Sequence, residues 1–419
     1  MPRLPNDCFS SPEDMISVEQ ARALITEKTG RIADTEFVEL QNSGGRVLAE
    51  DIYSSFDIPP ADNSAVDGYA FLHADYAAQQ DRAFNVAGRS AAGEPYIGDL
   101  SEGYCVKIFT GASVPARCDS IAMIEDVTEA ADTITLPAGL LPGINRRRAG
   151  EDLKAGVLVL KSGTKLRPQE VGQLASMGFN KIPVFRRIKV ALLSTGDELE
   201  NPGDSLPHGS IYDSNRYMLL QLLKKYGCEV KDYGIIRDTF ETLRDTISDA
   251  AANTDLVITS GGVSMGDEDH VKAAVEATGD LHFWRIAIKP GRPLALGQVG
   301  GTAFVGLPGN PVAALVCAIQ FVKPLIARLS GEAPPKDPFA LSGTATFSMK
   351  KKTGRREWLR GRYTCDENGV GKIEKFSSEG SGLISSLVWS NGLIELKEDT
   401  STITQGDSLR FFPYSELFE

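Results

Sequence analysis

Between residues 187 and 331, short apolar runs alternate with longer amphipathic segments. The runs at 190–193 and 256–259 are rich in β-branched and aliphatic side chains and are short enough to be buried strands. Apolar residues recur at helical spacing over 214–226 and 240–252. Because strands that alternate with helices form parallel sheets covered on both faces, we predict a doubly wound, mostly parallel α/β domain over residues 187–331.

The rest of the chain is dominated by short runs in which apolar and polar residues alternate. Residues 50–150 contain many such runs among glycines and prolines, which predicts an inserted, mostly β domain. Residues 339–419 alternate in the same way between turns, which predicts a small, barrel-like C-terminal β domain. Helical signals such as the one at 17–28 assign residues 1–49 and 151–186 to an N-terminal helical and β region. The predicted fold class is therefore multidomain α/β, with the doubly wound domain at its centre.

Composition and charge restrict the class of protein. Of the 419 residues, 42% are hydrophobic and 24% are charged, as in ordinary soluble globular chains. The net charge of −12 argues against general nucleic-acid binding, which depends on neutralising phosphates. The six cysteines include no C-x-x-C pair, and residues 1–10 lack the apolar stretch of a signal peptide. We therefore expect reduced thiols and a cytoplasmic protein.

One stretch resembles a membrane span in its lack of charge. No charged residue occurs between Arg292 and Lys323. Glycines and prolines interrupt this stretch, so we expect a strand, a loop and a buried helix there, and no membrane association.

The predicted strand at 256–259 leads into a stretch with candidate chemistry. Small residues are followed there by an acidic cluster, in the order Ser260, Gly261, Gly262, Ser264, Asp267, Glu268, Asp269. Glycines let a backbone approach a ligand closely, and ligands of open α/β sheets bind at the carboxyl ends of the strands. The carboxylates indicate a hard divalent cation that bridges to an anionic ligand.

Two other acidic loops follow predicted strands and should lie at the same sheet edge. Ser194-Thr195-Gly196-Asp197-Glu198 follows one strand, and Asp238 follows the next. Each is also compatible with an ordinary turn or helix cap, because Asp and Gly favour both. A magnesium site typically uses only one or two carboxylates, so not all of these side chains need be ligands.

Two further loops have features that favour the binding of an anion. Lys289-Pro290-Gly291-Arg292-Pro293 places two cations in a rigid turn, which is either an oxyanion clamp or a solvated turn. The segment from Gly306 to Pro311 follows a strand and opens a helix; its Pro308, Gly309 and Asn310 could approach a phosphate or form a plain strand–helix turn. The arginines at 146–148 and at 355–362 could supply positive potential or be solvated. His270 lacks metal-ligand spacing, and we interpret it as structural or solvated.

Several of these motifs, with others, occur together and in one order along nearly the whole chain. They are residues 59–70, 194–199, Asp213-Ser214-Asn215, 260–266, Lys289-Pro290-Gly291 and 306–311. Together they resemble the MoeA family of molybdopterin molybdenumtransferases, to which the gephyrin E domain also belongs.

The resemblance implies the last step of molybdenum cofactor synthesis. Adenylylated molybdopterin binds, its phosphoanhydride is cleaved with a divalent metal, Mg²⁺, and molybdate is inserted at the dithiolate as AMP is released. It also implies an elongated homodimer whose region 1–49 and 151–186 serves dimerisation, and transient contacts with the molybdopterin adenylyltransferase and with molybdoenzyme apoproteins.

The resemblance also implies roles for individual residues. Glu198, Asp238 and Asp269 serve the metal and pterin phosphate, and Lys289 and Arg292 hold molybdate or phosphate. With Asp62, these are the implied catalytic residues. The implied substrate contacts are Thr110, Asp152, Ser194, Thr195, Gly196, Ser260, Gly261, Gly262, Ser264, Pro308, Gly309 and Asn310. Asp62, Thr110 and Asp152 can complete the site from a second subunit.

One position departs from the family pattern. Arg292 stands where the family commonly has a lysine, so a planar fork replaces a point donor and the preference between molybdate and tungstate is open. Two other functions are open as well. One is molybdopterin adenylylation, which the extra β domains argue against; the other is a non-enzymatic scaffold of the gephyrin kind.

Overall fold

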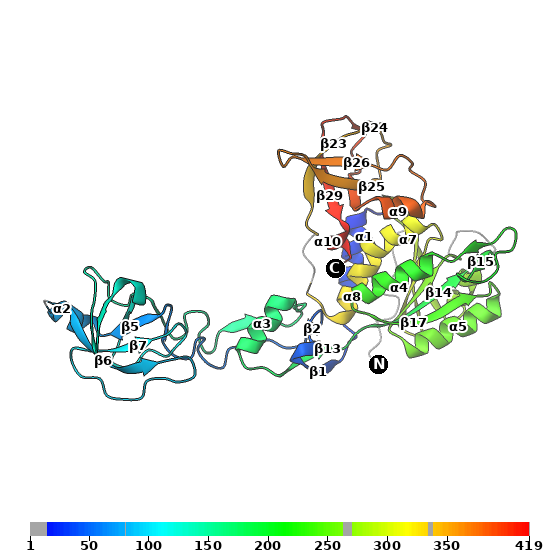
Figure 1. Ribbon diagram of the computed structural model, residues 1–419. Coiled ribbons are helices and arrows are strands. Elements are labelled where there is room, and N and C mark those ends of the chain that lie inside the picture. The colour runs from blue at the N-terminus through cyan, green and yellow to red at the C-terminus, as the bar shows by residue number, and fades with distance from the viewer. Residues whose placement is uncertain (1–14, 80, 263–269, 334–337, 419) are drawn as a thin grey trace. The chain divides into compact units, whose positions relative to one another are not determined.

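The computed structural model describes residues 15–79, 81–262, 270–333 and 338–418 (Figure 1). Its contacts divide the chain into two compact units. The larger unit comprises Met1–Ala49, Ser162–Arg167 and Ile182–Glu419, and the smaller comprises Glu50–Lys161 and Pro168–Lys181. The finer division into four domains stays a prediction.

The larger unit is built on a six-stranded sheet in the order β17-β14-β18-β22-β21-β19. Its strands are β14 (Lys189–Thr195), β17 (Glu229–Ile236), β18 (Leu256–Ser260), β19 (Gly279–Arg285), β21 (Pro293–Val299) and β22 (Thr302–Leu307). The first four in spatial order are parallel, whereas β21 and β19 join antiparallel at one edge. The prediction of a mostly parallel sheet is confirmed.

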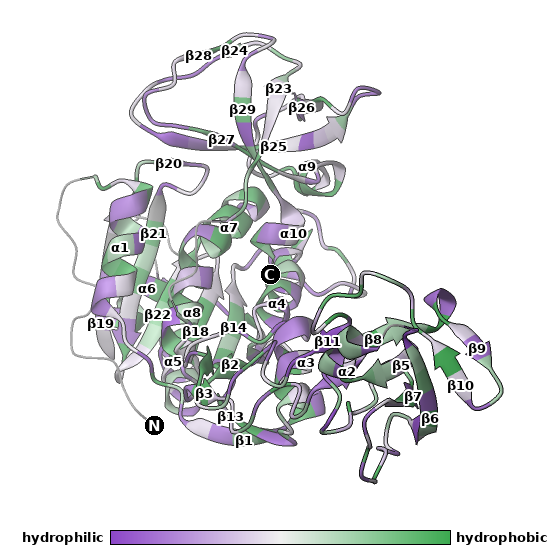
Figure 2. Ribbon diagram, turned by 90° about the vertical axis from the view of Figure 1, so that its left-hand side faces the viewer, coloured by the Kyte–Doolittle hydropathy of each residue, from purple (hydrophilic) through white to green (hydrophobic). Residues whose placement is uncertain are grey.

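Helices cover both faces of this sheet (Figures 1 and 2). Alternate residues of β14 face opposite sides: Val190 and Leu192 belong to one hydrophobic core, and Ala191 and Leu193 to the other. The helices of the first core are α1 (Val18–Lys28), α4 (Asn215–Lys225), α7 (Pro311–Cys317) and α8 (Lys323–Ser330). Those of the second core are α5 (Phe240–Asn253) and α6 (His270–Glu276). The doubly wound arrangement is therefore also confirmed.

The apolar stretch before residue 330 forms a single helical rod with a defect. The sequence predicts one regular helix, but a π-helical turn, η3 (Ala318–Val322), separates α7 from α8. Pro324 follows this turn, and a locally wider helix accommodates a residue that lacks an N–H donor. The rod, Pro311–Ser330, is long and apolar enough to cross a membrane, but 89% of its apolar window is buried inside the structure. It is the buried core helix expected from the sequence.

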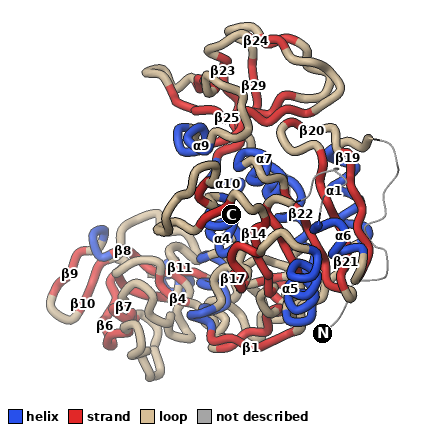
Figure 3. The backbone as a smooth tube through the Cα atoms, turned by 90° about the vertical axis from the view of Figure 1, so that its right-hand side faces the viewer, coloured by secondary structure: helices blue, strands red, loops and turns tan. Residues whose placement is uncertain are grey.

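The C-terminal part of the larger unit is a closed five-stranded barrel (Figure 3). Its strands are β23 (Leu341–Ala345), β25 (Arg356–Cys365), β26 (Gly371–Lys375), β27 (Gly392–Leu396) and β29 (Ser408–Pro413). The order β25-β26-β23-β29-β27 closes because β25 also pairs with β27. A short strand from the preceding domain, β20 (Ile288–Lys289), pairs with the start of β25. The predicted barrel-like domain is confirmed, and it joins the α/β domain through β20.

Shorter elements complete the larger unit. A three-stranded sheet has the order β1-β13-β2, and two short helices accompany the barrel. These elements are β1 (Thr35–Glu39), β2 (Val47–Leu48), β13 (Lys181–Phe185), β15 (Leu199–Glu200), β16 (Ile211–Tyr212), β24 (Met349–Lys350), β28 (Thr402–Ile403), α9 (Ile384–Trp389) and α10 (Tyr414–Leu417).

The smaller unit is mostly β, as the alternating pattern of residues 50–150 predicts. A six-stranded sheet has the order β8-β5-β7-β6-β10-β9, and two strand pairs, β3 with β12 and β4 with β11, extend the unit. The elements are β3 (Ile52–Tyr53), β4 (Asn63–Ser64), β5 (Gly68–Phe71), α2 (His73–Ala78), β6 (Ala83–Ser90), β7 (Tyr104–Ile108), β8 (Ser120–Met123), β9 (Thr128–Ala130), β10 (Thr133–Thr135), β11 (Arg146–Arg147), β12 (Leu158–Leu160) and α3 (Pro168–Ser176).

A buried ion pair fixes the starts of two central strands. The Asp255 carboxylate, before β18, accepts hydrogen bonds from both terminal nitrogens of Arg186, at 2.6 and 2.8 Å, and from the Lys189 backbone N–H at 2.8 Å. Asp255 is 3% exposed. We expect Asp255→Ala to reduce the free energy of unfolding by about 3 kcal/mol, because it leaves the mostly buried guanidinium with only the more distant carboxylate of exposed Asp34, at 3.8 Å.

Urea unfolding followed by tryptophan fluorescence measures this loss, since Trp284, Trp358 and Trp389 all belong to the larger unit. Asp245→Ala is the control: Asp245 pairs with Arg244 at the surface, where such pairs contribute under about 1 kcal/mol. Equal losses in the two variants would contradict the assignment.

Candidate functional site

The carboxyl ends of the parallel strands lie in register along one edge of the sheet. Ser194 of β14 is opposite Ser260 of β18, and Ser260 is opposite Leu307 of β22. On the other side of β14, Thr195 is opposite Ile236 at the end of β17. The loops that begin after these four strands therefore leave the sheet side by side, as predicted. Ser264 and Asp269 lie outside the described residues.

Glycine allows two of these loops to meet. Gly262 has a φ of +65°, and a Cβ atom placed on it would lie 2.2 Å from Thr195 Oγ1. Gly196 has a φ of +146°, and a Cβ there would lie 2.5 Å from Glu198 Oε2. Gly262 is therefore required for the close approach of the two loops, whereas at Gly196 the positive φ, and not the contact with the movable Glu198 side chain, disfavours other residues.

Carboxylates from different loops converge at this edge. Burial raises the pKa of Asp238; attraction to His270 opposes this shift, and repulsion by Asp197 and Glu198 adds to it. These interactions place the loop after β14, the loop after β17 and the start of α6 within electrostatic range of one another. The sequence predicted Glu198 and Asp238 together, and the structure brings them together.

Several buried oxygens at this edge have no hydrogen-bond partner among the described residues. They are Ser194 Oγ, Thr195 Oγ1, Thr259 Oγ1, Asn215 Oδ1 and Asp238 Oδ1. Buried polar atoms are nearly always paired, so these oxygens, which lie on both faces of the strand ends, are suited to a polar ligand or a hard cation. The described residues contain no group of three acidic, histidine or cysteine side chains that could hold a metal. Two carboxylates, Glu198 and Asp238, nevertheless match the number that Mg²⁺ typically takes from a protein.

Asn215, at the start of α4, connects the sheet edge to the neighbouring loop. Its Nδ2 donates to Ser260 Oγ at 3.0 Å and to the Gly309 carbonyl at 2.7 Å. Asn215 is 8% exposed and therefore holds the two loops at a fixed separation. Sequence reasoning gave this residue no role, although it stands in the quoted motif Asp213-Ser214-Asn215.

A cavity of about 330 Å³ lies next to the Gly309 loop. Lys289 and Arg292, which were predicted to hold an oxyanion, line it together with Pro308 and Asn310, which were predicted to contact the substrate. The barrel side contributes residues that sequence reasoning did not place: Arg355, Arg360, Glu379 and Ser381. Four cations therefore surround a space large enough for a small anion. We call this space the cationic cavity.

Lys289 is held by two carboxylates of the barrel side. Its Nζ lies 2.9 Å from Glu379 Oε2 and 3.3 Å from Glu357 Oε2. Burial lowers the pKa of Lys289, but its hydrogen bonds and attraction to the two carboxylates outweigh this and raise that pKa. Lys289 is thus a paired cation in the cavity wall, although its side chain is 39% exposed and Arg292 of the same turn is exposed.

Arg360 belongs to the part of the cavity wall that the barrel contributes. Its Nη2 donates to the carbonyls of Ser378 (2.8 Å) and Gly380 (3.0 Å), and its Nε donates to Ser386 Oγ (3.0 Å). Arg360 is only 3% exposed. In the sequence, Arg360 stands in the middle of a segment that alternates apolar and polar residues and is predicted to be a strand. A charged side chain inside such a strand needs specific partners, and this is the signal that could have identified Arg360.

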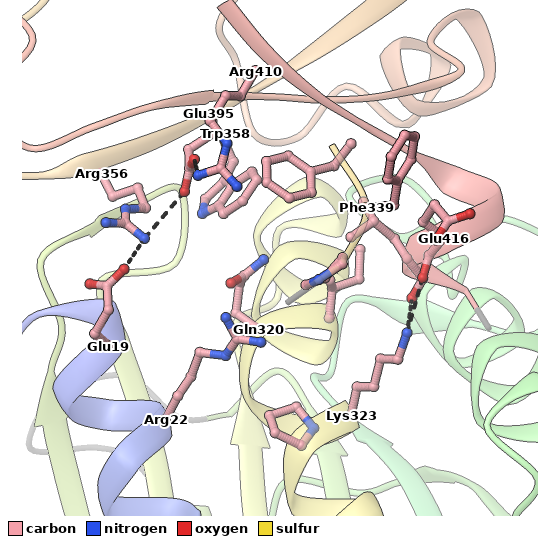
Figure 4. A pocket seen from close by; sticks show the side chains of 15 residues that line it. Glu19, Arg22, Gln320, Lys323, Phe339, Arg356, Trp358, Glu395, Arg410 and Glu416 are labelled. Carbon is pink, nitrogen blue, oxygen red and sulfur yellow. Dashed lines mark hydrogen bonds and ion pairs between the residues drawn. The ribbon is translucent and has the colours of Figure 1, made fainter. Parts of the chain in front are cut away.

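A second cavity, of about 430 Å³, lies between α1, the π-helical turn and α8, and the barrel (Figure 4). Arg356 forms ion pairs there with Glu19 of α1 and with Glu395 of β27, the latter at 3.2 Å. Lys323 donates to backbone carbonyls of α10. These contacts attach the barrel to the helices of the α/β domain and fix the start of β25, whose residues line both cavities.

The smaller unit gathers the other predicted site residues in one loop cluster. Asp62 accepts a hydrogen bond from the Ala149 N–H (2.8 Å) and lies 3.3 Å from Arg146. Thr110 donates to Asp67 from both its backbone (2.7 Å) and its hydroxyl (2.8 Å). These hydrogen bonds lower the pKa of Asp67. The backbone carbonyl of Asp62 accepts from the Val114 N–H, so this loop and the loop carrying Thr110 are neighbours.

Asp152 joins the same cluster through its backbone, which donates to the Ile58 carbonyl at 3.0 Å. Its side chain is exposed. The Asp67 carboxylate, which sequence reasoning did not single out, organises Thr110.

Comparison with known proteins identifies the family. Three family models match consecutive regions: "MoeA N-terminal region (domain I and II)" over residues 16–178, "Probable molybdopterin binding domain" over 191–328, and "MoeA C-terminal region (domain IV)" over 342–414. The molybdopterin molybdenumtransferase of Haemophilus influenzae is 41% identical over 404 residues, which are 96% of this chain and 100% of that protein. The chain belongs to the molybdopterin molybdenumtransferase (MoeA) family.

Other relatives agree with this membership. A solved structure of the Pyrococcus horikoshii OT3 molybdopterin biosynthesis MoeA protein is 31% identical, with a TM-score of 0.81 over 96% of this chain and 100% of that one. Gephyrin of Dictyostelium discoideum is 34% identical over 366 residues, 77% of this chain but 50% of gephyrin. Members of the MoeA family are transferases of molybdenum cofactor biosynthesis, so the expected enzyme class and the resemblance are both confirmed.

Proposed function

We propose that the chain inserts molybdate into adenylylated molybdopterin and releases AMP, with Mg²⁺ as the divalent metal. The observation that carries this proposal is the position of the cationic cavity next to the carboxylate-bearing sheet edge, with Asn215 bonded to loops of both. One region suits a small oxyanion and the other a phosphate with a hard cation. This reaction needs both ligands side by side.

At the sheet edge, Glu198 and Asp238 are the described residues that would hold Mg²⁺, and Asp269 is the third residue implied by the resemblance. When bound, the ion neutralises charge on the phosphoanhydride and favours departure of AMP. The hydroxyls of Ser194 and Thr195 have no partner among the described residues and point to opposite faces of β14, so each would donate to a different polar group of the bound ligand. Their burial excludes water, which strengthens each of these interactions.

In the cationic cavity, Lys289, Arg292 and Arg360 bind the oxyanion by charge. The guanidinium of Arg292 presents a planar fork of donors, so it orients a tetrahedral oxyanion by two parallel hydrogen bonds where a lysine would offer a single point.

The test uses purified chain incubated with adenylylated molybdopterin, Mg²⁺ and molybdate. We expect AMP to be released in proportion to active cofactor, measured by reconstituting a cofactor-free molybdoenzyme. Omission of molybdate or addition of a chelator should suppress cofactor formation. Absence of both products would refute the proposal, and ATP-dependent adenylylation of molybdopterin by the chain alone would favour the adenylyltransferase function.

We further propose that the protein is a cytoplasmic homodimer that contacts the molybdopterin adenylyltransferase and molybdoenzyme apoproteins transiently. The resemblance to the family supports this, and Asp62, Thr110 and Asp152 would then serve the site. Light scattering gives the mass in solution. A variant Asp62→Asn mixed with Glu198→Gln should recover part of the activity if one subunit supplies Asp62 to the other.

A further inference from the structure

Glu379 occupies the side of Lys289 that faces the cationic cavity. Its carboxylate lies 2.9 Å from the lysine ammonium, and both residues line the cavity. A carboxylate at hydrogen-bond distance from a cation is what a tetrahedral oxyanion would present to the same lysine. Lys289 already has a second carboxylate partner, Glu357, at 3.3 Å, so an oxyanion that took the position of Glu379 would have to displace Glu379 or be repelled by it.

The second carboxylate at Lys289 has a different character. Glu357 lies on β25, where it is paired directly opposite Lys289 of β20, and its side chain is 5% exposed. Glu379 lies in the irregular segment between β26 and α9, and its side chain is 44% exposed. Glu357 is therefore a fixed partner that orients the lysine, whereas Glu379 can move into solvent at little cost.

Arg360 fixes the position of the backbone on both sides of Glu379. Its guanidinium binds the carbonyls of Ser378 and Gly380, the residues on either side of Glu379. The Val312 N–H donates to the Ser381 carbonyl at 3.0 Å and so attaches the same segment to α7. The backbone around Glu379 is thus fixed at the cavity wall, while its side chain retains freedom to turn away.

We propose that Glu379 is an internal competitor of the oxyanion, which occupies Lys289 when the cavity is empty of anion and turns away when a tetrahedral dianion binds. This rests on the proposed function of the cavity and adds a residue that sets the affinity of the site. Four cations and one carboxylate, that of Glu379, line the cavity. Glu357, which does not line the cavity, forms a second ion pair with Lys289 and neutralises its charge. Release of Glu379 leaves enough positive charge for a doubly charged oxyanion. Weakly charged or monovalent anions gain less from the exchange, so Glu379 favours dianions.

Equilibrium dialysis of sodium molybdate against the purified chain, with metal analysis of both compartments, tests the proposal. We expect Glu379→Gln to bind molybdate about fivefold more tightly than the original chain, the range expected for a half-exposed ion pair. In the Lys289→Met background, Glu379→Gln should produce no change, because the competition acts through that lysine. The thermal midpoint should fall by no more than about 2 °C on Glu379→Gln, since a half-exposed ion pair contributes under about 1 kcal/mol.

Glu374→Gln is the matched control, since it removes a charge from exposed Glu374 on β26 of the same barrel, outside the cavity. An equal gain in Glu374→Gln would show a general charge effect and overturn the proposal. Equal binding by the original chain and Glu379→Gln would also overturn it, while leaving the oxyanion site intact. No molybdate binding by any variant would instead remove the oxyanion site itself.

Discussion

Replacement of Glu198 by Gln is expected to lower the rate of cofactor formation by about 10³-fold, because a bound metal ion contributes several kcal/mol of charge stabilisation in the transition state. Glu198 follows β14, and its carboxylate folds back over Gly196 towards the loop that carries Asp238. Gln has the same shape but lacks the negative charge that holds a hard cation. The loss should therefore fall on turnover, with little effect on binding of the pterin.

The same substitution should leave the fold unchanged. Glu198 is exposed, and substitutions of exposed residues usually change the free energy of unfolding by under about 0.5 kcal/mol. The measurements are AMP release and cofactor formation at saturating Mg²⁺, together with the thermal midpoint. Asp204→Asn, in the exposed segment between β15 and β16, is the control and should retain full activity. Undiminished turnover of Glu198→Gln would remove this residue from the site.

Local patterns along the chain were sufficient to predict the sheet edge. The apolar runs that became β14 and β18 identify buried strands, and parallel pairing then puts their carboxyl ends together without further information. Ser17 at the start of α1 is another example, since its hydroxyl and the Gln20 side chain form the capping box that local sequence indicates. In each case the partners are close in sequence or are set by a general rule of topology.

The barrel side of the cationic cavity could not be predicted in this way. Glu357 and Glu379 reach Lys289 from 68 and 90 positions away, through the pairing of β20 with β25 and the path of the segment after β26. No periodicity encodes such a contact. The arginines at 355–362 illustrate the difficulty: Arg360 lines the cavity, whereas the neighbouring Arg362 stacks over Trp389 at 4.5 Å. Only the packed structure distinguishes them.

Replacement of Lys289 by Met is expected to raise the molybdate concentration needed for half-maximal cofactor formation by about 30-fold. Hydrogen bonds to charged groups contribute about 2 kcal/mol, which corresponds to this factor. Because Lys289 lines the cationic cavity and is not one of the carboxylates that would hold the metal, the maximal rate at saturating molybdate should change much less. The measurement is cofactor formation as a function of molybdate at fixed adenylylated molybdopterin.

A structural effect must be separated from this loss of charge. Glu357 is 4% exposed, so removal of Lys289 leaves a buried carboxylate without its cation and should destabilise the barrel. The double variant Lys289→Met with Glu357→Gln removes that charge as well; it should recover stability without recovering the molybdate affinity. Recovery of both would mean that Lys289 only maintains the fold, and an unchanged molybdate dependence in the single variant would exclude Lys289 from the oxyanion site. Together, the single and double variants show whether the charge of Lys289 binds the oxyanion or only stabilises the fold.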